Sequence, residues 1–143
     1  MEPAPDHPGW LDWRVADEGL YNHAVIGRTL VRRDDEAHCR VRIMPRRALT
    51  NLAGGIHGGA ILGLIDISLF VALKVLRDVD AGRTSTLTLD TQFVGPGNSQ
   101  APLDSVVEVL RETGRLCFLR GLVEQDGALV ASFHATVRKP SRA

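Results

Sequence analysis

The longest apolar stretch of the chain runs from Ala60 to Leu73, and its only charged residue is Asp66. A helix that is apolar on nearly all sides must be covered by the rest of its fold. The stretch is shorter than the ~20 apolar residues that cross a bilayer, and a carboxylate in its middle disfavours a membrane span. The pattern therefore predicts a buried helix over about residues 57–77 and no membrane span.

On both sides of this helix, mixed runs of apolar and polar residues are separated by turn residues, which is typical of strands. We expect strands at 28–33, 37–44, 84–94, 103–111, 116–124 and 129–138. The last three form a meander whose turns fall at Glu112-Thr113-Gly114 and Gln125-Asp126-Gly127. One helix with five or so antiparallel strands predicts a curved sheet wrapped round the helix.

Strict alternation along residues 84–94 predicts which side chains share a face of that strand. On one face we expect Thr84, Thr86, Thr88, Asp90 and Gln92. On the other we expect Ser85, Leu87, Leu89, Thr91 and Phe93.

A length of 143 residues suits one domain. We expect a single domain over residues 19–140, preceded by a poorly structured arm over residues 1–18 that Trp10 and Trp13 pin to the body. Residues 1–8 have no basic start and no apolar core, so they do not resemble a signal peptide.

Charge and cysteine content exclude several classes of function. Seventeen Lys and Arg residues balance 17 Asp and Glu residues, which argues against nucleic-acid binding through bulk charge. Cys39 and Cys117 lie in no CxxC or Cys/His spacing, so no metal site is expected. Two isolated thiols indicate reduced cysteines and a cytoplasmic protein.

The segment His57-Gly58-Gly59 opens the predicted helix. The first turn of a helix has unpaired N–H groups and partial positive charge. Because glycines leave these groups uncovered, a ligand oxygen or a thioester carbonyl can approach them. The alternative is that the two glycines serve only close packing.

Asp66 is a lone acid within the apolar helix, so it is either functional or bonded to a neighbouring element. Gly59 and Asp66 lie on nearly the same helix face but about 10.5 Å apart along the axis. The helix N-terminus and Asp66 of one chain therefore cannot both touch one carbonyl. If they share a site, the site needs two chains with antiparallel helices, and the sequence predicts a homodimer with two equivalent sites.

The segment resembles the signature of PaaI-type acyl-CoA thioesterases of the hotdog superfamily. It has Asn51 six residues before His57, then His-Gly-Gly, then Asp66 nine residues after the histidine. The resemblance covers about residues 20–138 and implies an α+β hotdog fold with five to six strands around one long helix. A strand that usually ends in Leu-Arg-Pro after an aromatic residue here has Gly95 in place of the arginine.

The resemblance implies hydrolysis of an aromatic or medium- to long-chain acyl-CoA, with no cofactor besides the substrate's own coenzyme A. Asp66 would be the general base or the nucleophile, and the Gly58 N–H would polarise the carbonyl. Asn51 would orient water or the carbonyl from the partner chain, His57 would help hold the site loop or contact the thioester, and Thr86 would hydrogen-bond the water or Asp66.

Arg83 and Arg115 are expected to contact the phosphates of coenzyme A, which need cationic partners. Gly59, at the helix start, and Gly114, where the family often has a Gly-Lys or Gly-Arg pair, are expected in the same binding site. The resemblance also implies a homotetramer built from dimers, and no nucleic-acid partner. Two other functions also occur on the hotdog fold. A hotdog hydratase needs an Asp/His or His/Glu arrangement that this segment lacks. A non-catalytic acyl-CoA-binding module uses the same fold as a ligand sensor.

Overall fold

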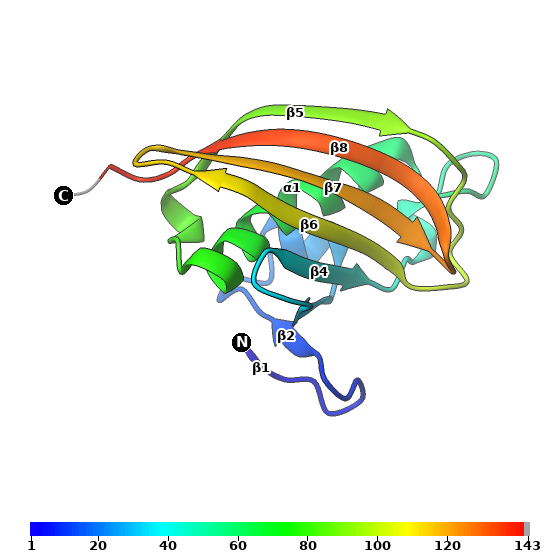
Figure 1. Cartoon of the computed structure of the whole chain (residues 1–143). Coiled ribbons are helices and arrows are strands. Elements are labelled where there is room, and N and C mark those ends of the chain that lie inside the picture. The colour runs from blue at the N-terminus through cyan, green and yellow to red at the C-terminus, as the bar shows by residue number, and fades with distance from the viewer. Residues whose placement is uncertain (142–143) are drawn as a thin grey trace.

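An eight-stranded antiparallel sheet curls round one long helix in the computed structural model, which describes residues 1–141 (Figure 1). The strand order is β1-β2-β3-β4-β6-β7-β8-β5. This is the predicted hotdog arrangement, with two short N-terminal strands added at one edge. The strands are β1 (Glu2–Pro3), β2 (Leu11–Trp13), β3 (Thr29–Arg33), β4 (His38–Ile43), β5 (Ser85–Phe93), β6 (Leu103–Glu112), β7 (Leu116–Gln125) and β8 (Ala128–Arg138).

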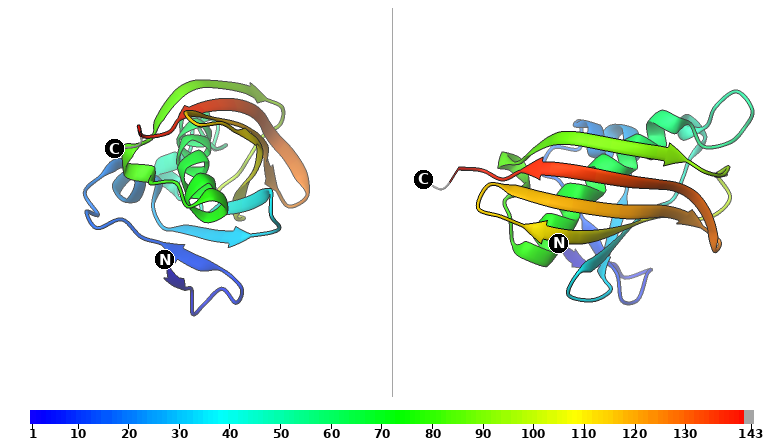
Figure 2. Two further views of the ribbon diagram at one scale, coloured as in Figure 1. Left: turned by 60° about the vertical axis from the view of Figure 1, so that its left-hand side comes forward. Right: turned by 45° about the horizontal axis from the view of Figure 1, so that its top comes forward.

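Helix α1 (Gly58–Arg77) lies in the hollow of the sheet, as the end-on view in Figure 2 shows. Twelve of its 20 residues are buried, among them Leu64, Ile65, Leu69 and Leu73, each with no exposed surface. Burying one such side chain contributes about 1.5–3 kcal/mol. The helix ends at Asp78, whose left-handed backbone lets its N–H reach the last carbonyls.

The length and composition of α1 would also permit a membrane crossing. However, 67% of its most apolar stretch is buried inside the fold. The core of the protein therefore accounts for this apolarity.

Strand β5 forms the free edge of the sheet opposite the N-terminal strands. It pairs with β8, and the register slips by one residue between Thr86 and Thr88. This bulge reverses the alternation at Leu87, so Thr86 shares the helix-facing side with Leu89 and Thr91. The predicted grouping of Thr86 with Thr88 on one face was therefore wrong, because an unseen bulge interrupts the strand.

The β7–β8 hairpin turns at Asp126-Gly127, both with positive φ, as the turn sequence predicted. Within β7, Gly121 lies under the ring of Phe133 from β8. A Cβ atom at Gly121 would lie 2.3 Å from the Phe133 ring and from the Val106 carbonyl oxygen. Any larger residue at position 121 would therefore clash with both neighbouring strands, β6 and β8.

The structure places strands β1 and β2 in the stretch where we expected a poorly structured arm. Trp10 is buried beneath the guanidinium groups of Arg32 and Arg42, whose Cζ atoms lie 4.8 and 4.4 Å from the ring centroid. The Arg28 guanidinium donates to Asp12 at 2.6 Å and to Asp6 at 2.6 Å. These contacts fasten residues 2–13 to the outside of β3.

Candidate functional site

The loop before α1 extends from the body of the molecule in the views of Figures 1 and 2. Asn51 shapes it: the side-chain Oδ1 accepts hydrogen bonds from the N–H groups of Ala53 (3.0 Å) and Gly55 (3.1 Å). The loop returns to the fold where the Ile56 N–H donates to the Gly97 carbonyl at 3.0 Å. Asn51 is exposed, so its amide NH2 group is accessible to a ligand or a second chain.

His57 is the N-cap of α1. Its Nδ1 accepts a hydrogen bond from the Gly59 N–H at 2.8 Å, so that nitrogen carries no proton and the neutral ring has its proton on Nε2. Among residues 1–141, the Gly58 N–H has no hydrogen-bond acceptor. The first amide of the helix is therefore free, while the second is taken by the histidine.

Asp66 lies eight residues further along α1 and is half-buried. The Thr86 hydroxyl of β5 donates to its Oδ1 at 2.8 Å. The carboxylate thus has one fixed oxygen, and its other oxygen makes no hydrogen bond within the described chain. A carboxylate held in this way can accept a proton from water or attack a carbonyl carbon.

Within one chain, the Gly58 N–H and the Asp66 carboxylate, the two halves of the candidate site, are held apart, because eight residues of helix span about 12 Å. Both halves open onto the same face of α1, where Gly59 and Leu62 are exposed and Asp66 and Phe70 are half-buried. This open face adjoins the free edge of β5, where Leu87 and Phe93, and Val94 directly after the strand, are each more than half exposed. An apolar face and an unpaired strand edge on one side of a molecule are typical of a surface that meets another chain.

A cavity of about 280 Å³ lies beside Asp66. Besides the carboxylate, its walls are mostly apolar and come from the N-terminal arm, the helical turn η1 (Asn22–Ile26), α1 and the turn η3 (Ala81–Arg83). The lining residues are Trp13, Val15, Asn22, Asp66, Ile67, Phe70, Val71, Ala81 and Gly82. The carboxylate therefore faces a space that an organic group can occupy.

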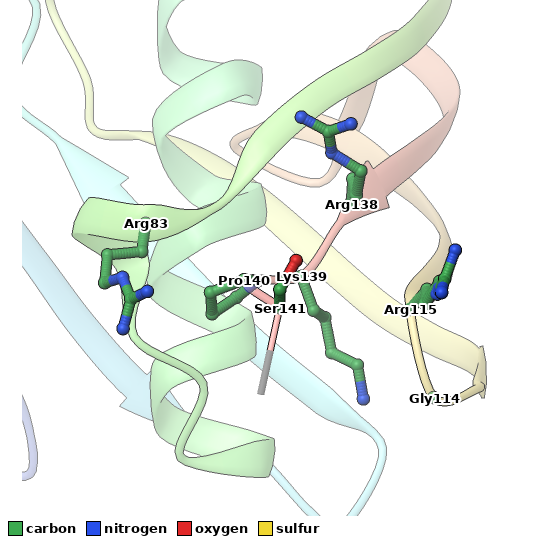
Figure 3. Close-up of a pocket in the computed structure, with 7 residues that line it drawn as sticks. All are labelled: Arg83, Gly114, Arg115, Arg138, Lys139, Pro140 and Ser141. Carbon is green, nitrogen blue, oxygen red and sulfur yellow. The ribbon is translucent and has the colours of Figure 1, made fainter. Parts of the chain in front are cut away.

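A second, larger cavity of about 750 Å³ is lined by basic side chains from three separate elements (Figure 3). It brings together the predicted residues Arg83, Gly114 and Arg115 with Arg138, Lys139 and the segment Pro140-Ser141. Lys139 is paired with Glu112 at 2.7 Å, whereas the three arginines have no carboxylate partner within residues 1–141. Although the chain has no net charge, this cavity concentrates positive charge suited to phosphate groups.

The turn η3 joins the two cavities, since Ala81 and Gly82 line the first and Arg83 lines the second. Gly95 has no room for the side chain that the family pattern places there, because a Cβ would lie 2.6 Å from the Leu129 carbonyl oxygen.

The sequence analysis did not identify Arg138, Lys139, Trp13 or Phe70 as site residues. Arg138 reaches the basic cavity because β8 lies between β5 and β7, where it pairs with Ser85 and Leu116. That strand order is not readable from local pattern. No cluster of three His, Cys, Asp or Glu side chains suited to a metal ion occurs in the described part of the chain.

Residues 46–138 match the family model of the acyl-CoA thioesterase N-terminal domain. The fold is similar to a mutant form of the phenylacetic acid degradation protein PaaI from Thermus thermophilus, with a TM-score of 0.68 and 24% identity over 83% of this chain and 97% of that chain. Thioesterase superfamily member 2 from zebra fish has a TM-score of 0.75 at 17% identity, over 87% and 89% of the two chains.

A hypothetical thioesterase from Streptococcus pneumoniae, in a structure with coenzyme A, has a TM-score of 0.69 at 17% identity over 80% of this chain and 91% of that chain. At such identities these likenesses establish the shared fold. No curated protein matches the sequence.

Proposed function

This chain belongs to the acyl-CoA thioesterase family, whose members are thioester hydrolases, and on that premise we propose that it hydrolyses an acyl-CoA with Asp66 as general base or nucleophile. The observation that carries the proposal is the Asp66 carboxylate, held by Thr86 at 2.8 Å on the wall of a largely apolar cavity. A thioester whose acyl group occupies this cavity would bring its carbonyl carbon to the carboxylate.

In the general-base route, Asp66 takes a proton from a water molecule whose oxygen attacks the thioester carbonyl carbon. The C–S bond then breaks, the acid is released, and the coenzyme A thiolate takes up the proton. In the nucleophile route, an Asp66 oxygen attacks the carbonyl carbon first, the C–S bond breaks with loss of the coenzyme A thiolate, and a mixed anhydride forms on Asp66. Water then hydrolyses the anhydride, which releases the acid and restores the Asp66 carboxylate, and the proton from that water goes to the thiolate. Both routes place negative charge on the carbonyl oxygen, which a free helix N-terminal amide would stabilise.

That amide is the Gly58 N–H, and it would come from the partner chain of a homodimer, because one chain keeps it about 12 Å from Asp66. The open face of α1 and the free β5 edge support this pairing. Asn51 would orient the water or the carbonyl through its amide, and His57 would fix the Gly59 amide and hence the start of the helix. A homotetramer of two such dimers is the assembly that we propose, in the cytoplasm.

Coenzyme A would place its phosphates among Arg83, Arg115 and Arg138, the three arginines of the basic cavity, none of which has a carboxylate partner within residues 1–141. Gly114 would allow close approach, since nothing lies within 4 Å of a Cβ built there. Lys139 would contribute less, because Glu112 already balances its charge.

The test is thiol release with a thiol-reactive dye across a panel of acyl-CoA substrates. For Asp66→Ala we expect kcat to fall by about 10²-fold or more, because general acid–base catalysis contributes 10²–10⁴-fold. The matched control is Asp90→Ala, which removes an exposed carboxylate from the outer face of β5 and should leave kcat unchanged.

Equal rates for wild type and Asp66→Ala would remove Asp66 from the chemistry. No turnover of any thioester by the wild type, together with tight acyl-CoA binding, would instead support the non-catalytic binding module.

A further inference from the structure

The cavity beside Asp66 contains two of the chain's few aromatic side chains. The whole sequence has two Trp, one Tyr and four Phe residues, and both Trp13 and Phe70 line this one space of about 280 Å³. Both are half-buried and pack against the main core. Their flat faces give the cavity walls that a planar or compact group can contact over a large area.

Trp13 reaches the cavity because of the pleat of β2. Side chains three positions apart in an extended segment point to opposite faces, so the side chains of Trp10 and Trp13 lie on opposite sides of the sheet. Trp10 forms a small outer cluster with Ala4 and Leu30, whereas Trp13 packs against the main core. The pairing of Trp13 with Thr29 and the ion pair of Asp12 with Arg28 at 2.6 Å hold this residue in place.

The cavity volume limits what can enter. Sites for drug-sized ligands enclose about 300–1,000 Å³, so a cavity of about 280 Å³ suits a small group. The N-terminal arm closes the cavity on one side through Trp13 and Val15, and η1 contributes Asn22. An extended long-chain acyl group would need the arm to move away.

We propose that Trp13 is a specificity-determining residue that closes the acyl pocket and restricts it to compact, aromatic acyl groups. This inference rests on the proposed thioesterase function and names the substrate class for the same site. The acyl ring lies between the aromatic walls, and the thioester carbonyl lies toward Asp66. The arm therefore sets the size of the substrate, and the carboxylate performs the reaction.

The kinetic test compares kcat/KM for benzoyl-CoA, hexanoyl-CoA and palmitoyl-CoA in wild type, Trp13→Ala and Trp13→Phe. We expect wild type to prefer benzoyl-CoA. Trp13→Ala should lower kcat/KM for benzoyl-CoA by about tenfold or more, as expected for lost pocket contacts, and leave palmitoyl-CoA unchanged or faster. Trp13→Phe should restore most of the preference. An equal fall for all three substrates, or no change, would overturn the proposal.

A binding test separates this inference from the reaction itself. In Trp10→Phe, Trp13 is the sole tryptophan, so its fluorescence reports on the pocket. A benzyl thioether of coenzyme A, which cannot be hydrolysed, should change this fluorescence in a saturable manner, and coenzyme A alone should not. That result supports binding of an aromatic group beside Trp13 even if no thioester is hydrolysed. No change, or the same change with coenzyme A alone, overturns it even if hydrolysis occurs.

Discussion

At the scale of single residues, Asp66 has one side-chain hydrogen-bond partner in the described chain, Thr86, and a β-bulge in β5 places it there. The β-bulge at Leu87 turns Thr86 inward, where its hydroxyl donates to Asp66 Oδ1 at 2.8 Å. Thr88, two residues later, lies on the outer face of the same strand and is exposed. The two threonines therefore form a natural pair for separating the effect of the hydrogen bond from the effect of the strand.

Replacing Thr86 by Val removes the hydroxyl and keeps the shape of the side chain. A hydrogen bond to a charged group contributes about 1.5–3 kcal/mol, so we expect kcat to fall by about 10- to 100-fold. Thr88→Val should be close to wild type in the same thiol-release assay. Equal effects of the two substitutions would mean that Thr86 acts through the strand rather than through Asp66.

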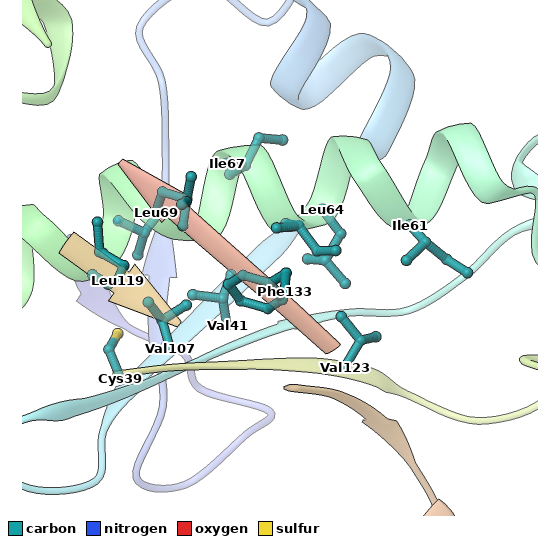
Figure 4. Close-up of a cluster of buried hydrophobic side chains, with 14 of the residues drawn as sticks. Cys39, Val41, Ile61, Leu64, Ile67, Leu69, Val107, Leu119, Val123 and Phe133 are labelled. Atoms are coloured by element: carbon teal, nitrogen blue, oxygen red, sulfur yellow. The ribbon is translucent and has the colours of Figure 1, made fainter. Parts of the chain in front are cut away.

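Cys39 and Cys117 lie in the core, without exposed surface (Figure 4 labels Cys39). Burial raises the pKa of the Cys39 thiol to about 12 and raises that of Cys117. Since thiolates are the reactive form, we expect neither to react with a thiol-reactive dye in the native protein at about pH 8 and both to react in denaturant. Rapid labelling of the native protein would contradict the buried placement. Because neither cysteine is expected to react with the dye, the protein itself should add no background signal to the thiol-release assay.

At the scale of elements, the ion pair of Asp12 with Arg28 helps to join the N-terminal arm to the domain, beside the packing of Trp10 and Trp13. Hydrogen bonds from the Arg28 guanidinium hold the pKa of the Asp12 carboxyl below its ordinary value of 3.8. Because the folded-state pKa is the lower one, this contribution is complete above the unfolded value and is lost as the pH falls through the folded value. The stabilisation from this ion pair is therefore complete at neutral pH and lost only in strong acid.

Asp12→Asn tests this attachment. We expect its free energy of unfolding in urea to be lower than that of wild type at neutral pH, and the difference to shrink as the pH falls below 3.8, the ordinary value of this carboxyl. Glu18→Gln, which changes an exposed acid without an ion pair among residues 1–141, should match wild type at every pH. A difference that persists undiminished in acid would show that the pairing with Arg28 is not its source.

At the scale of the whole molecule, helix α1 carries functional groups at two places that one chain cannot use together. Its N-terminus offers the free Gly58 amide, and its middle offers Asp66. A two-fold axis that packs two open faces antiparallel would bring each Asp66 to the other chain's N-terminus. The same axis would cover the exposed edge of β5.

A mixing experiment tests this arrangement. Asp66→Ala and Asn51→Ala should each be nearly inactive as homodimers. In mixed dimers one site has both defects and the other has neither, so random exchange of chains should restore about one quarter of wild-type activity. If Asn51 served the Asp66 of its own chain, every site would keep one defect and mixing would restore nothing.

Much of the fold could be predicted from the sequence. The apolar run determines α1, and turn residues such as Asp126-Gly127 place the hairpins, because these signals act over a few neighbouring residues. The spacing of Asn51, His57, Gly58 and Asp66 also gave the candidate chemistry and the prediction of a two-chain site, since helix geometry alone converts a spacing in residues into a distance.

Tertiary structure alone decided the surroundings of Asp66 and the composition of the basic cavity, because both depend on contacts between residues far apart in the chain. The bulge that aims Thr86 at Asp66 arises from the register of β5 against β8, and the strand order gathers Arg83, Arg115 and Arg138 into one cavity. Trp13 lies beside Asp66 because β2 pairs with β3 and its pleat turns that side chain inward. The sequence by itself determined the elements and singled out Asp66 as the candidate carboxylate, whereas packing between distant strands decided what surrounds it.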